Sequence, residues 1–450
     1  YLRSSNITAE HIRARGTLHY DHLKQKMAVT GLSLTLKETR LKKLPQTEKA
    51  PLHITFNATG DMDFRKRKAA FNGLSLNVQK RLQFNGILEA NFGHQPNFEL
   101  IIGEGRGFTR RLMSLLPKGV LGKSGEFNIS GPVDFSGTFR GSENQGQWAF
   151  DCNMEGNLKN SPVSYRPQKI HINGLMTAQV AIQGPISNLK LSGNLAGNQM
   201  ALKEKRLSMK AAEGAFNFSG TYPYFEIRNL SCRIPEITHL LENKAFSVEN
   251  MVIGSKKGQV NVLNRSLNFP EIKLKSSLLS NILATLQMNG DGLTFTAKAK
   301  EAGLIHAAKA LKLLPSNWTF RGMDSVEVEA VMDKKGTISF SAGLALDKFD
   351  FKNPQEAYLG ENISLKAHIS GRMTPPQSTI TVVSEMGADG GEILMDRFYF
   401  NLKENPFSAQ SSGTYQGLNK RLKFENLSLK MKEIAVAHVT GTLFQAGDEY

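Results

Sequence analysis

Few residues have the types and spacing needed for chemistry, and each such group lacks a required partner. Gly122-Lys123-Ser124 resembles the end of a phosphate-binding loop, whose backbone N–H groups and lysine hold nucleotide phosphates. The first glycine of that motif would fall at Pro117, and the residues after Ser124 have the pattern of a strand, whereas the motif requires a helix. The sequence therefore does not predict a nucleotide site here.

Three alternate glycines, Gly103, Gly105 and Gly107, lie between an expected strand and an expected helix. They lack the G-x-G-x-x-G spacing of a dinucleotide-binding turn, and no β-α-β pattern surrounds them. We interpret them as a flexible entry into the helix.

The residue spacing does not predict a metal site or an acid–base catalytic site either. His19 and His22 flank Asp21, but a metal site needs further ligands and none is close in the sequence, so a polar hairpin turn is favoured. Residues 389–391, Asp-Gly-Gly, are typical of a turn. No Ser-His-Asp or Cys-His grouping follows from the spacing. We expect no catalytic residue, no metal, no cofactor and no enzymatic activity.

The charge balance favours an anionic partner. The chain of 450 residues has 56 basic and 40 acidic residues, a formal charge of +16, which suits lipid headgroups, lipopolysaccharide or nucleic acid. The basic residues are spread along the chain, with the densest run at 65–68, and no interleaved aromatic residues could stack on bases. Nucleic acid is therefore disfavoured. Cys152 and Cys232 are too few for a disulfide scaffold.

The strands that must build any site are marked by a recurring sequence phrase. The phrase consists of an apolar residue, a turn-prone pair and then Leu-Ser-Leu. It begins at Val29, Phe71 and Phe424, and in looser form at Ile227 and Glu361. We interpret each copy as a strand that starts after a turn at Gly or Asn, with alternation that directs the leucines to one face. One such face cannot be buried by a single strand, so repetition predicts many copies with one continuous apolar surface.

This pattern predicts the residues that line the apolar surface. They occupy the leucine positions of the repeated phrase, or the equivalent apolar positions of similar alternating strands. They are Leu32, Leu34, Leu36, Leu74, Leu76, Val78, Leu230, Ile234, Leu293, Phe295, Ile338, Phe340, Ile363, Leu365, Leu427, Leu429 and Met431.

Strand-like alternation recurs through nearly the whole chain, so we expect a mainly β protein with an antiparallel, repetitive, elongated sheet. Two or three short amphipathic helices interrupt it. One is expected at 104–117, ending at Pro117, and one at 300–315, ending at Pro315. A weaker third is expected at 235–244, behind Pro235. In the second, His306, Lys309 and Lys312 form a narrow polar stripe.

We expect residues 1–450 to form one continuous segment of a longer protein. The two Leu-Leu-Pro sequences at Pro117 and Pro315 are 198 residues apart, which suggests duplicated units of about 200 residues, roughly 70–265 and 266–450. No apolar run approaches the ~20 residues that cross a bilayer. Any membrane anchor is therefore expected outside this segment.

The G-L-S-L and N-L-S-L phrases, the G-P-V-D-F-S-G-T phrase from Gly131 and the G-P-I-S-N-L-K-L-S-G-N-L phrase from Gly184 resemble the AsmA-like group of bacterial envelope proteins. The helix, Leu-Leu-Pro and strand unit is most similar to the YdbH branch of that group. This resemblance implies a bridge-like lipid transfer protein with a β-sheet folded into a U-shaped apolar groove. It further implies an inner-membrane anchor and a location in the periplasm of a Gram-negative bacterium.

The expected function is therefore intermembrane phospholipid transport in an apolar groove, with phospholipids as the partner. Two alternatives stay open. One is a chaperone or assembly factor for outer-membrane β-proteins, which would bind an outer-membrane or periplasmic partner by β-strand addition. The other is a passive β-solenoid with a filled core, in which the leucines only stabilise the fold.

Overall fold

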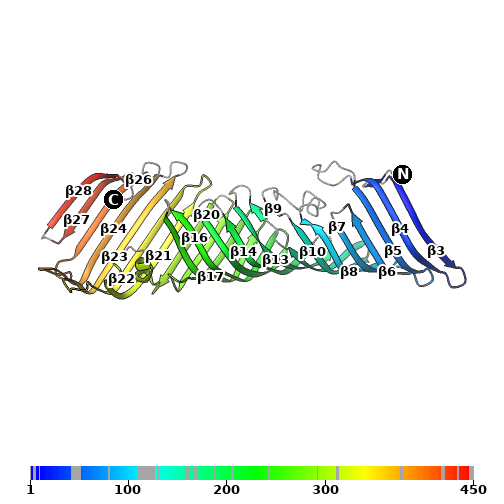
Figure 1. The fold of residues 1–450 in the computed structure, drawn as a ribbon, viewed down its shortest axis with the longest axis horizontal. Coiled ribbons are helices and arrows are strands. Elements are labelled where there is room, and N and C mark those ends of the chain that lie inside the picture. Colours follow the sequence, from blue (N-terminus) through cyan, green and yellow to red (C-terminus); the bar gives the residue numbers. More distant parts are fainter. Residues whose placement is uncertain are drawn as a thin grey trace. The chain divides into compact units, whose positions relative to one another are not determined.

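The computed structural model describes residues 2–3, 7–9, 11–41, 52–79, 82–109, 127–129, 131–158, 163–165, 170–185, 188–203, 207–241, 244–290, 292–310, 314–374, 379–416, 421–432 and 435–444. Its contacts group the chain into unit 1, Tyr1–Asn243, and unit 2, Lys244–Tyr450. Almost all described residues of both units lie in β-strands, which confirms the predicted mainly β fold (Figure 1). The duplication into 70–265 and 266–450 remains a prediction.

Unit 1 is an open antiparallel sheet. Its strands are β1 (Leu2–Arg3), β2 (Ile7–Ala9), β3 (His11–Asp21), β4 (Lys26–Leu41), β5 (Leu52–Asp63), β6 (Lys68–Val78), β7 (Leu82–Asn91), β8 (Asn97–Phe108), β9 (Phe127–Ile129), β10 (Pro132–Asn144), β11 (Gln147–Leu158), β12 (Val163–Tyr165), β13 (Ile170–Pro185), β14 (Lys190–Lys203), β15 (Leu207–Thr221) and β16 (Tyr224–Leu241). From β3 to β8, and from β13 to β16, each strand pairs with the next in the chain. In between, β8 pairs with β10, β10 with β11 and β11 with β13.

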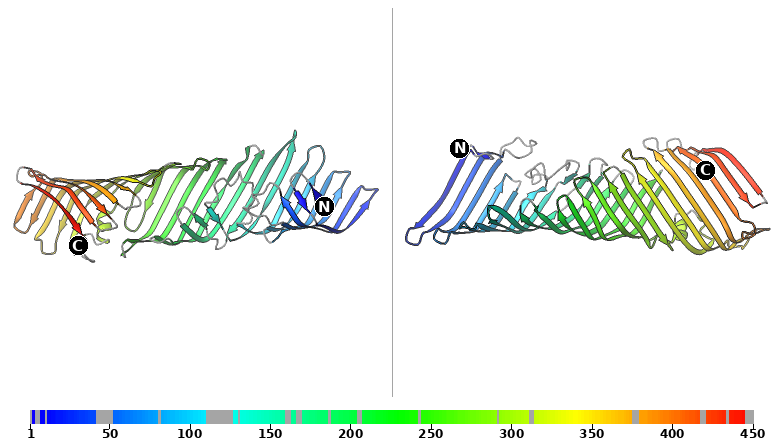
Figure 2. Two further views of the ribbon diagram at one scale, coloured as in Figure 1. Left: turned by 90° about the horizontal axis from the view of Figure 1, so that it is seen from above. Right: turned by 180° about the vertical axis from the view of Figure 1, so that it is seen from behind.

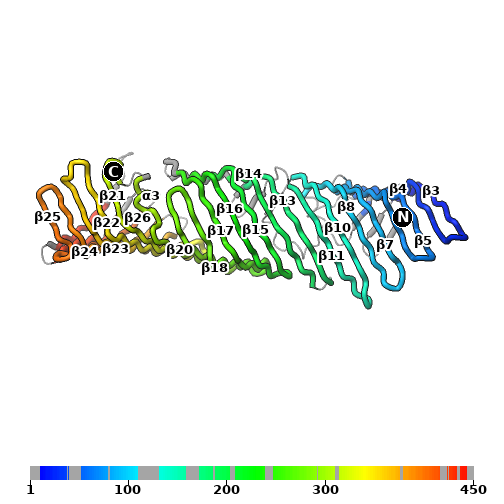
Figure 3. Tube along the Cα trace, turned by 90° about the horizontal axis from the view of Figure 1, so that it is seen from below, coloured from blue at the N-terminus to red at the C-terminus, as the bar shows by residue number. Residues whose placement is uncertain are grey.

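Unit 2 repeats this arrangement. Its elements are β17 (Lys244–Asn261), β18 (Ser266–Lys275), β19 (Ile282–Asn289), β20 (Gly292–Lys300), the helix α3 (Leu304–Ala310), β21 (Thr319–Met332), β22 (Ile338–Lys352), β23 (Tyr358–Thr374), β24 (Thr379–Met395), β25 (Phe398–Asn401), β26 (Phe407–Gln416), β27 (Arg421–Met431) and β28 (Ala435–Phe444). Strands β17 to β24 pair in chain order, β24 then pairs with both β25 and β26, and β26 continues through β27 to β28. The tube in Figure 3 shows the chain reversing at alternate edges of each sheet.

The Leu-Ser-Leu phrase marks β-bulges within strands and does not mark strand starts. In β4 the register with β5 shifts between Val29 and Leu32, and Gly31 lies there with φ of 62°. Asn229 in β16 and Asn362 in β23 occupy the same left-handed region, with φ of 53° and 51°. Such residues let an extra residue enter one strand of a pair without ending it. The expectation that Gly or Asn turns the chain at these points was therefore wrong.

These bulges bend the strands. A bulged strand curves locally and increases its right-handed twist. Register shifts occur near the middle of most paired strands, for example between Asn57 and Gly60 in β5 and between Phe71 and Leu74 in β6. The strands of each unit accordingly curve along their length in the two views of Figure 2.

The helix expectations have mixed outcomes. The second helix forms as α3, Leu304–Ala310. The third was wrong, because residues 235–241 belong to β16, where Ile237 pairs with Met209. In the ladder that β16 forms with β15, Pro235 has no partner between the pairs at 233 and 236, so its missing N–H is tolerated on that side. In the first expected helix, 104–117, residues 104–108 instead belong to strand β8. Residues 110–126, which include Gly122-Lys123-Ser124, lie outside the described residues.

Candidate functional site: the apolar face of each sheet

Directly paired residues of neighbouring strands lie on the same face of a sheet, so the register can be followed from strand to strand. Rows of almost wholly apolar or glycine residues cross unit 1 in this way. The central row runs through Ala14, Leu34, Phe56, Leu76, Phe84, Gly105, Phe135, Gly156, Ala178, Leu195 and Phe216. A second runs through Ile12, Leu36, Ile54, Val78, Leu82, Gly107, Val133, Leu158, Met176, Gly197, Gly214 and Cys232.

The other face of the same strands is polar. One of its rows runs through Arg13, Thr35, Thr55, Asn77, Gln83, Arg106, Asp134, Asn157 and Thr177. Ion pairs lie on this face, including Arg140 Nη2 with Glu99 Oε1 at 2.7 Å. The sheet of unit 1 therefore has one apolar and one polar face over eleven strands, counted along the central row.

Unit 2 has the same separation. One apolar row runs through Leu267, Met288, Leu293, Met332, Ile338, Met373, Ile380, Tyr415, Leu422 and Leu443. The next runs through Phe269, Leu286, Phe295, Ala330, Phe340, Gly371, Val382, Gly413, Phe424 and Gly441. Between them lies a mainly polar row of the opposite face, with Asn268, Gln287, Thr294, Val331, Ser339, Arg372, Thr381, Thr414, Lys423 and Thr442.

The structure places the residues singled out from the sequence on these apolar faces. Those of unit 1 are Leu32, Leu34, Leu36, Leu74, Leu76, Val78, Leu230 and Ile234. Those of unit 2 are Leu293, Phe295, Ile338, Phe340, Ile363, Leu365, Leu427, Leu429 and Met431. Leu230 and Ile234 follow by alternation with Cys232, which pairs with Gly214. That these residues contact lipid remains a prediction.

Sequence reasoning missed many members of the same rows. Phe56, Phe84, Phe135 and Phe216 belong to the central row of unit 1 but to no copy of the Leu-Ser-Leu phrase. Gly105 and Gly107, interpreted as a helix entry, alternate within β8, and the Phe135 ring covers Gly105 so closely that an added Cβ would lie 2.3 Å from it. Only the strand register identifies these residues.

Among the described elements, no second sheet covers the apolar faces. In the described part of each unit, elements contact their neighbours in the sheet, and α3 contacts β21. On the apolar rows, Ile369 is 43 % exposed and Val439 49 % exposed. By contrast Ala58, Ala212 and Ala284 are at most 2 % exposed on the same faces. Alanines reach such values in a single sheet where larger neighbouring side chains on the same face cover them.

Aromatic side chains concentrate on the apolar faces. In unit 1 the Phe139 and Phe150 rings stack with centroids 5.4 Å apart. In unit 2 the Trp318 ring stacks on Phe320 and Phe351, with centroids 6.1 and 5.9 Å apart. These ring contacts stiffen the apolar face of each unit.

Helix α3 is fixed by a carboxylate from the neighbouring strand. Buried Asp324 of β21 accepts hydrogen bonds from Gly303 N at 3.2 Å and from Leu304 N at 2.5 Å, which satisfies the first N–H groups of the helix. Lys309 Nζ donates to Trp318 O at 2.7 Å and lies 5.2 Å from the Phe320 ring centroid. Lys309 therefore packs against Phe320 of β21, whereas His306, from the same expected stripe, is exposed; Lys312 lies outside the described residues.

The residues weighed for chemistry have structural roles. Asp21 accepts hydrogen bonds from Lys24 N and Leu23 N, both at 3.1 Å, and the bond from Lys24 is the largest cause of its lowered pKa. Residues 389–391 lie inside β24, with Gly391 at φ of 94°, so the expected turn was wrong. Burial raises the thiol pKa of Cys152 and of Cys232, both unpaired. Among the described residues no three His, Cys, Asp or Glu side chains come together as metal ligands.

Comparison with known proteins gives no match to a family model, a curated protein or a solved structure. Within the described residues, none of the helices has the length and apolarity needed to span a bilayer.

Proposed function

We propose that the chain is a non-enzymatic conduit for phospholipids, in which acyl chains lie on the apolar faces and headgroups stay in water. The observation that supports this is the continuity of the apolar rows across successive strands, with no covering layer among the described residues. An uncovered apolar face of this size marks a binding surface.

The energetics favour movement along such rows. Covering one CH₂ group is worth about 0.8 kcal/mol, so removing a whole chain into water is costly. Each row offers a similar apolar contact at every strand, roughly every 4.8 Å. One large desorption barrier is thereby replaced by many small and nearly equal steps.

The wider setting belongs to the same proposal. The protein would work in the periplasm of a Gram-negative bacterium, between the inner and outer membranes, with an inner-membrane anchor outside this segment. It would need no cofactor. A partner protein at the outer membrane or in the periplasm would join by strand addition to the sheet.

A passive solenoid with a filled core is less well supported, because a filled core would require a second layer over the rows and the described residues supply none. A chaperone that pairs with client strands would depend on the strand edges and make no use of the apolar face.

Native mass spectrometry of the protein purified without detergent tests the proposal. We expect phospholipid adducts that survive gentle ionisation and disappear after delipidation. Protein that carries no lipid, and that takes up none from phospholipid vesicles, would contradict the conduit.

A further inference from the structure

Three hairpin tips form a continuous rim at one edge of unit 1. Residues 20–26 connect β3 to β4, 63–68 connect β5 to β6, and 91–97 connect β7 to β8. Phe64 N donates to Gln25 O at 2.9 Å, and Phe92 N donates to Arg67 O at 2.9 Å. The tips are thus held side by side, and we call these three segments the tip rim.

The first two tips share one turn geometry. Gln25 and Arg67 occupy equivalent positions with φ of 52° and 54°. Asp21 Oδ1 accepts from Leu23 N at 3.1 Å, and Asp63 Oδ1 accepts from Lys66 N at 2.8 Å. These carboxylates close the turns and hold the residues between them outward.

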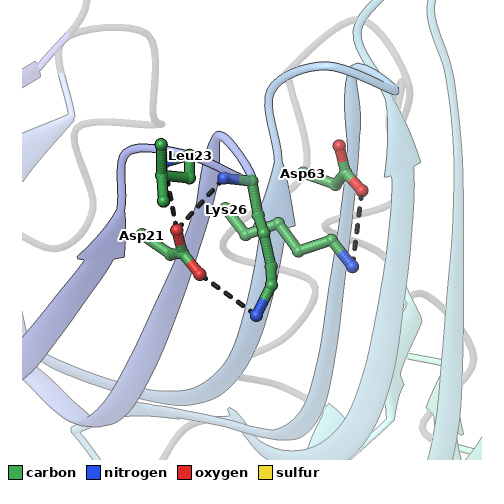
Figure 4. Close-up of polar contacts among 5 residues, drawn as sticks. Asp21, Leu23, Lys26 and Asp63 are labelled. Carbon is green, nitrogen blue, oxygen red and sulfur yellow. Dashed lines mark hydrogen bonds and ion pairs between the residues drawn. The ribbon is translucent and has the colours of Figure 1, made fainter.

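Both acidic side chains of the tip rim, Asp21 and Asp63, form ion pairs within the rim. Lys24 Nζ lies 3.3 Å from Asp21 Oδ2, and Lys26 Nζ lies 3.7 Å from Asp63 Oδ2 (Figure 4). The turns at 20–26 and 63–68 contain six basic residues against these two acids, a net charge of +4. The basic residues are Lys24, Lys26, Arg65, Lys66, Arg67 and Lys68.

Large apolar side chains are exposed among these charges. Leu23 is 94 % exposed, and Tyr20, Phe64 and Phe92 are 51 %, 41 % and 40 % exposed. The three rings form a ladder, with centroid distances of 6.1 Å from Tyr20 to Phe64 and 6.3 Å from Phe64 to Phe92. Exposed aromatic and aliphatic side chains beside lysine and arginine are typical of segments that enter the interface of an anionic bilayer.

We propose that the tip rim docks on the surface of a bilayer that contains anionic phospholipid. Leu23 and Phe64 enter the boundary between headgroups and acyl chains, while Arg65 and Lys66 contact lipid phosphates. The rings pack edge to face on one another, at interplanar angles of 75° and 65°, so they do not offer successive flat faces to nucleic-acid bases. Membrane docking does not depend on whether lipids travel along the sheet.

The test is sedimentation of the protein with vesicles of phosphatidylcholine and phosphatidylglycerol, and with vesicles of phosphatidylcholine alone. We expect binding to the anionic vesicles, weakened by high salt. R65Q/K66Q should weaken it about 25-fold, at about fivefold per charge. L23S/F64S should weaken it at least about tenfold by removing apolar contact.

Two matched controls should bind as the unmodified protein does. Leu263, 71 % exposed, donates its N–H to Asn261 Oδ1 at 3.0 Å in an equivalent turn of unit 2, so L263S is the apolar control. K334Q/K335Q, in another turn, is the charge control.

Absent binding, equal binding to neutral vesicles, or equal loss in tip and control variants would overturn the proposal. If L23S/F64S binds anionic vesicles as well as the unmodified protein does, the proposed insertion of Leu23 and Phe64 into the bilayer is wrong. Native mass spectrometry of R65Q/K66Q and L23S/F64S separates this result from the proposed function, because both variants should still carry co-purified phospholipid.

Discussion

Replacement of Leu76 by aspartate places a charge in the middle of the apolar face of unit 1. Leu76 pairs with Phe56 on one side and Phe84 on the other, and its side chain is only partly buried. A carboxylate at this position can reach water, but it removes the apolar contact at that step of the row.

The expected effect on transport follows from the strand spacing. One spacing of ~4.8 Å covers about four CH₂ groups of an extended acyl chain. Loss of their contact with the apolar face raises the activation barrier of that step by about 3 kcal/mol, which slows it roughly 150-fold. The loss of stability should be about 2 kcal/mol, because Leu76 is partly exposed and a carboxylate at this position still reaches water.

Leu74 provides the matched control. It lies two residues away on the same strand and face but is 5 % exposed, so Leu74→Asp buries a charge without a partner. Leu74→Asp should lower the free energy of unfolding by about 3–5 kcal/mol and clearly lower the melting temperature.

The assay pairs the melting temperature, followed by circular dichroism, with transfer of a fluorescent phospholipid between donor and acceptor vesicles. Complementation of an envelope-permeability defect in cells gives a second readout. If Leu76→Asp unfolds the protein as Leu74→Asp does, the face is a closed core. If Leu76→Asp transfers lipid at the normal rate, the face is not the path.

Further predictions concern the fold. Gly86→Ala should destabilise unit 1 by about 1–3 kcal/mol, because an added Cβ would lie 2.3 Å from Ile101 O, whereas Gly103→Ala, with open space, should be neutral in urea unfolding. Asp324→Ala should cost about 1–2 kcal/mol and speed amide exchange in α3, while Asp324→Asn retains part of the protection; unchanged exchange would rule out the cap. The pKa of Asp333 is lowered chiefly by the bond from Thr337 N, so its contribution is present above pH 3.8 and lost as pH falls below it. Asp333→Asn should remove this acid-dependent loosening of the turn, measured by amide exchange.

The sequence predicted the β class and the composition of the faces because both depend on period-two alternation, which is local. Leu74 and Leu76, for example, could be assigned to one face from three residues of sequence. The partners of each strand could not be read in this way, since Phe56 and Phe84 join the row of Leu76 through register alone.

Bulges and one helix were misread for related reasons. A residue such as Asn229 in the left-handed region has the same local signature in a turn and in a bulge, and only pairing with the next strand distinguishes them. The segment after Pro235 has apolar residues that fit either period, and its pairing with β15 decides for a strand. Asp324, 20 residues from Leu304, could not be recognised as a helix cap without the fold.

Photo-crosslinking within single strands tests the central claim most directly. A photoreactive residue at Leu76 or Leu429 would lie on the apolar face, and one at Ser75 or Ser428 on the polar face of the same strand. In cells, the two leucine positions should capture phospholipid and the two serine positions should not. Equal capture at both, or none at the leucine positions in a folded protein, would contradict the proposal that acyl chains lie on the apolar face.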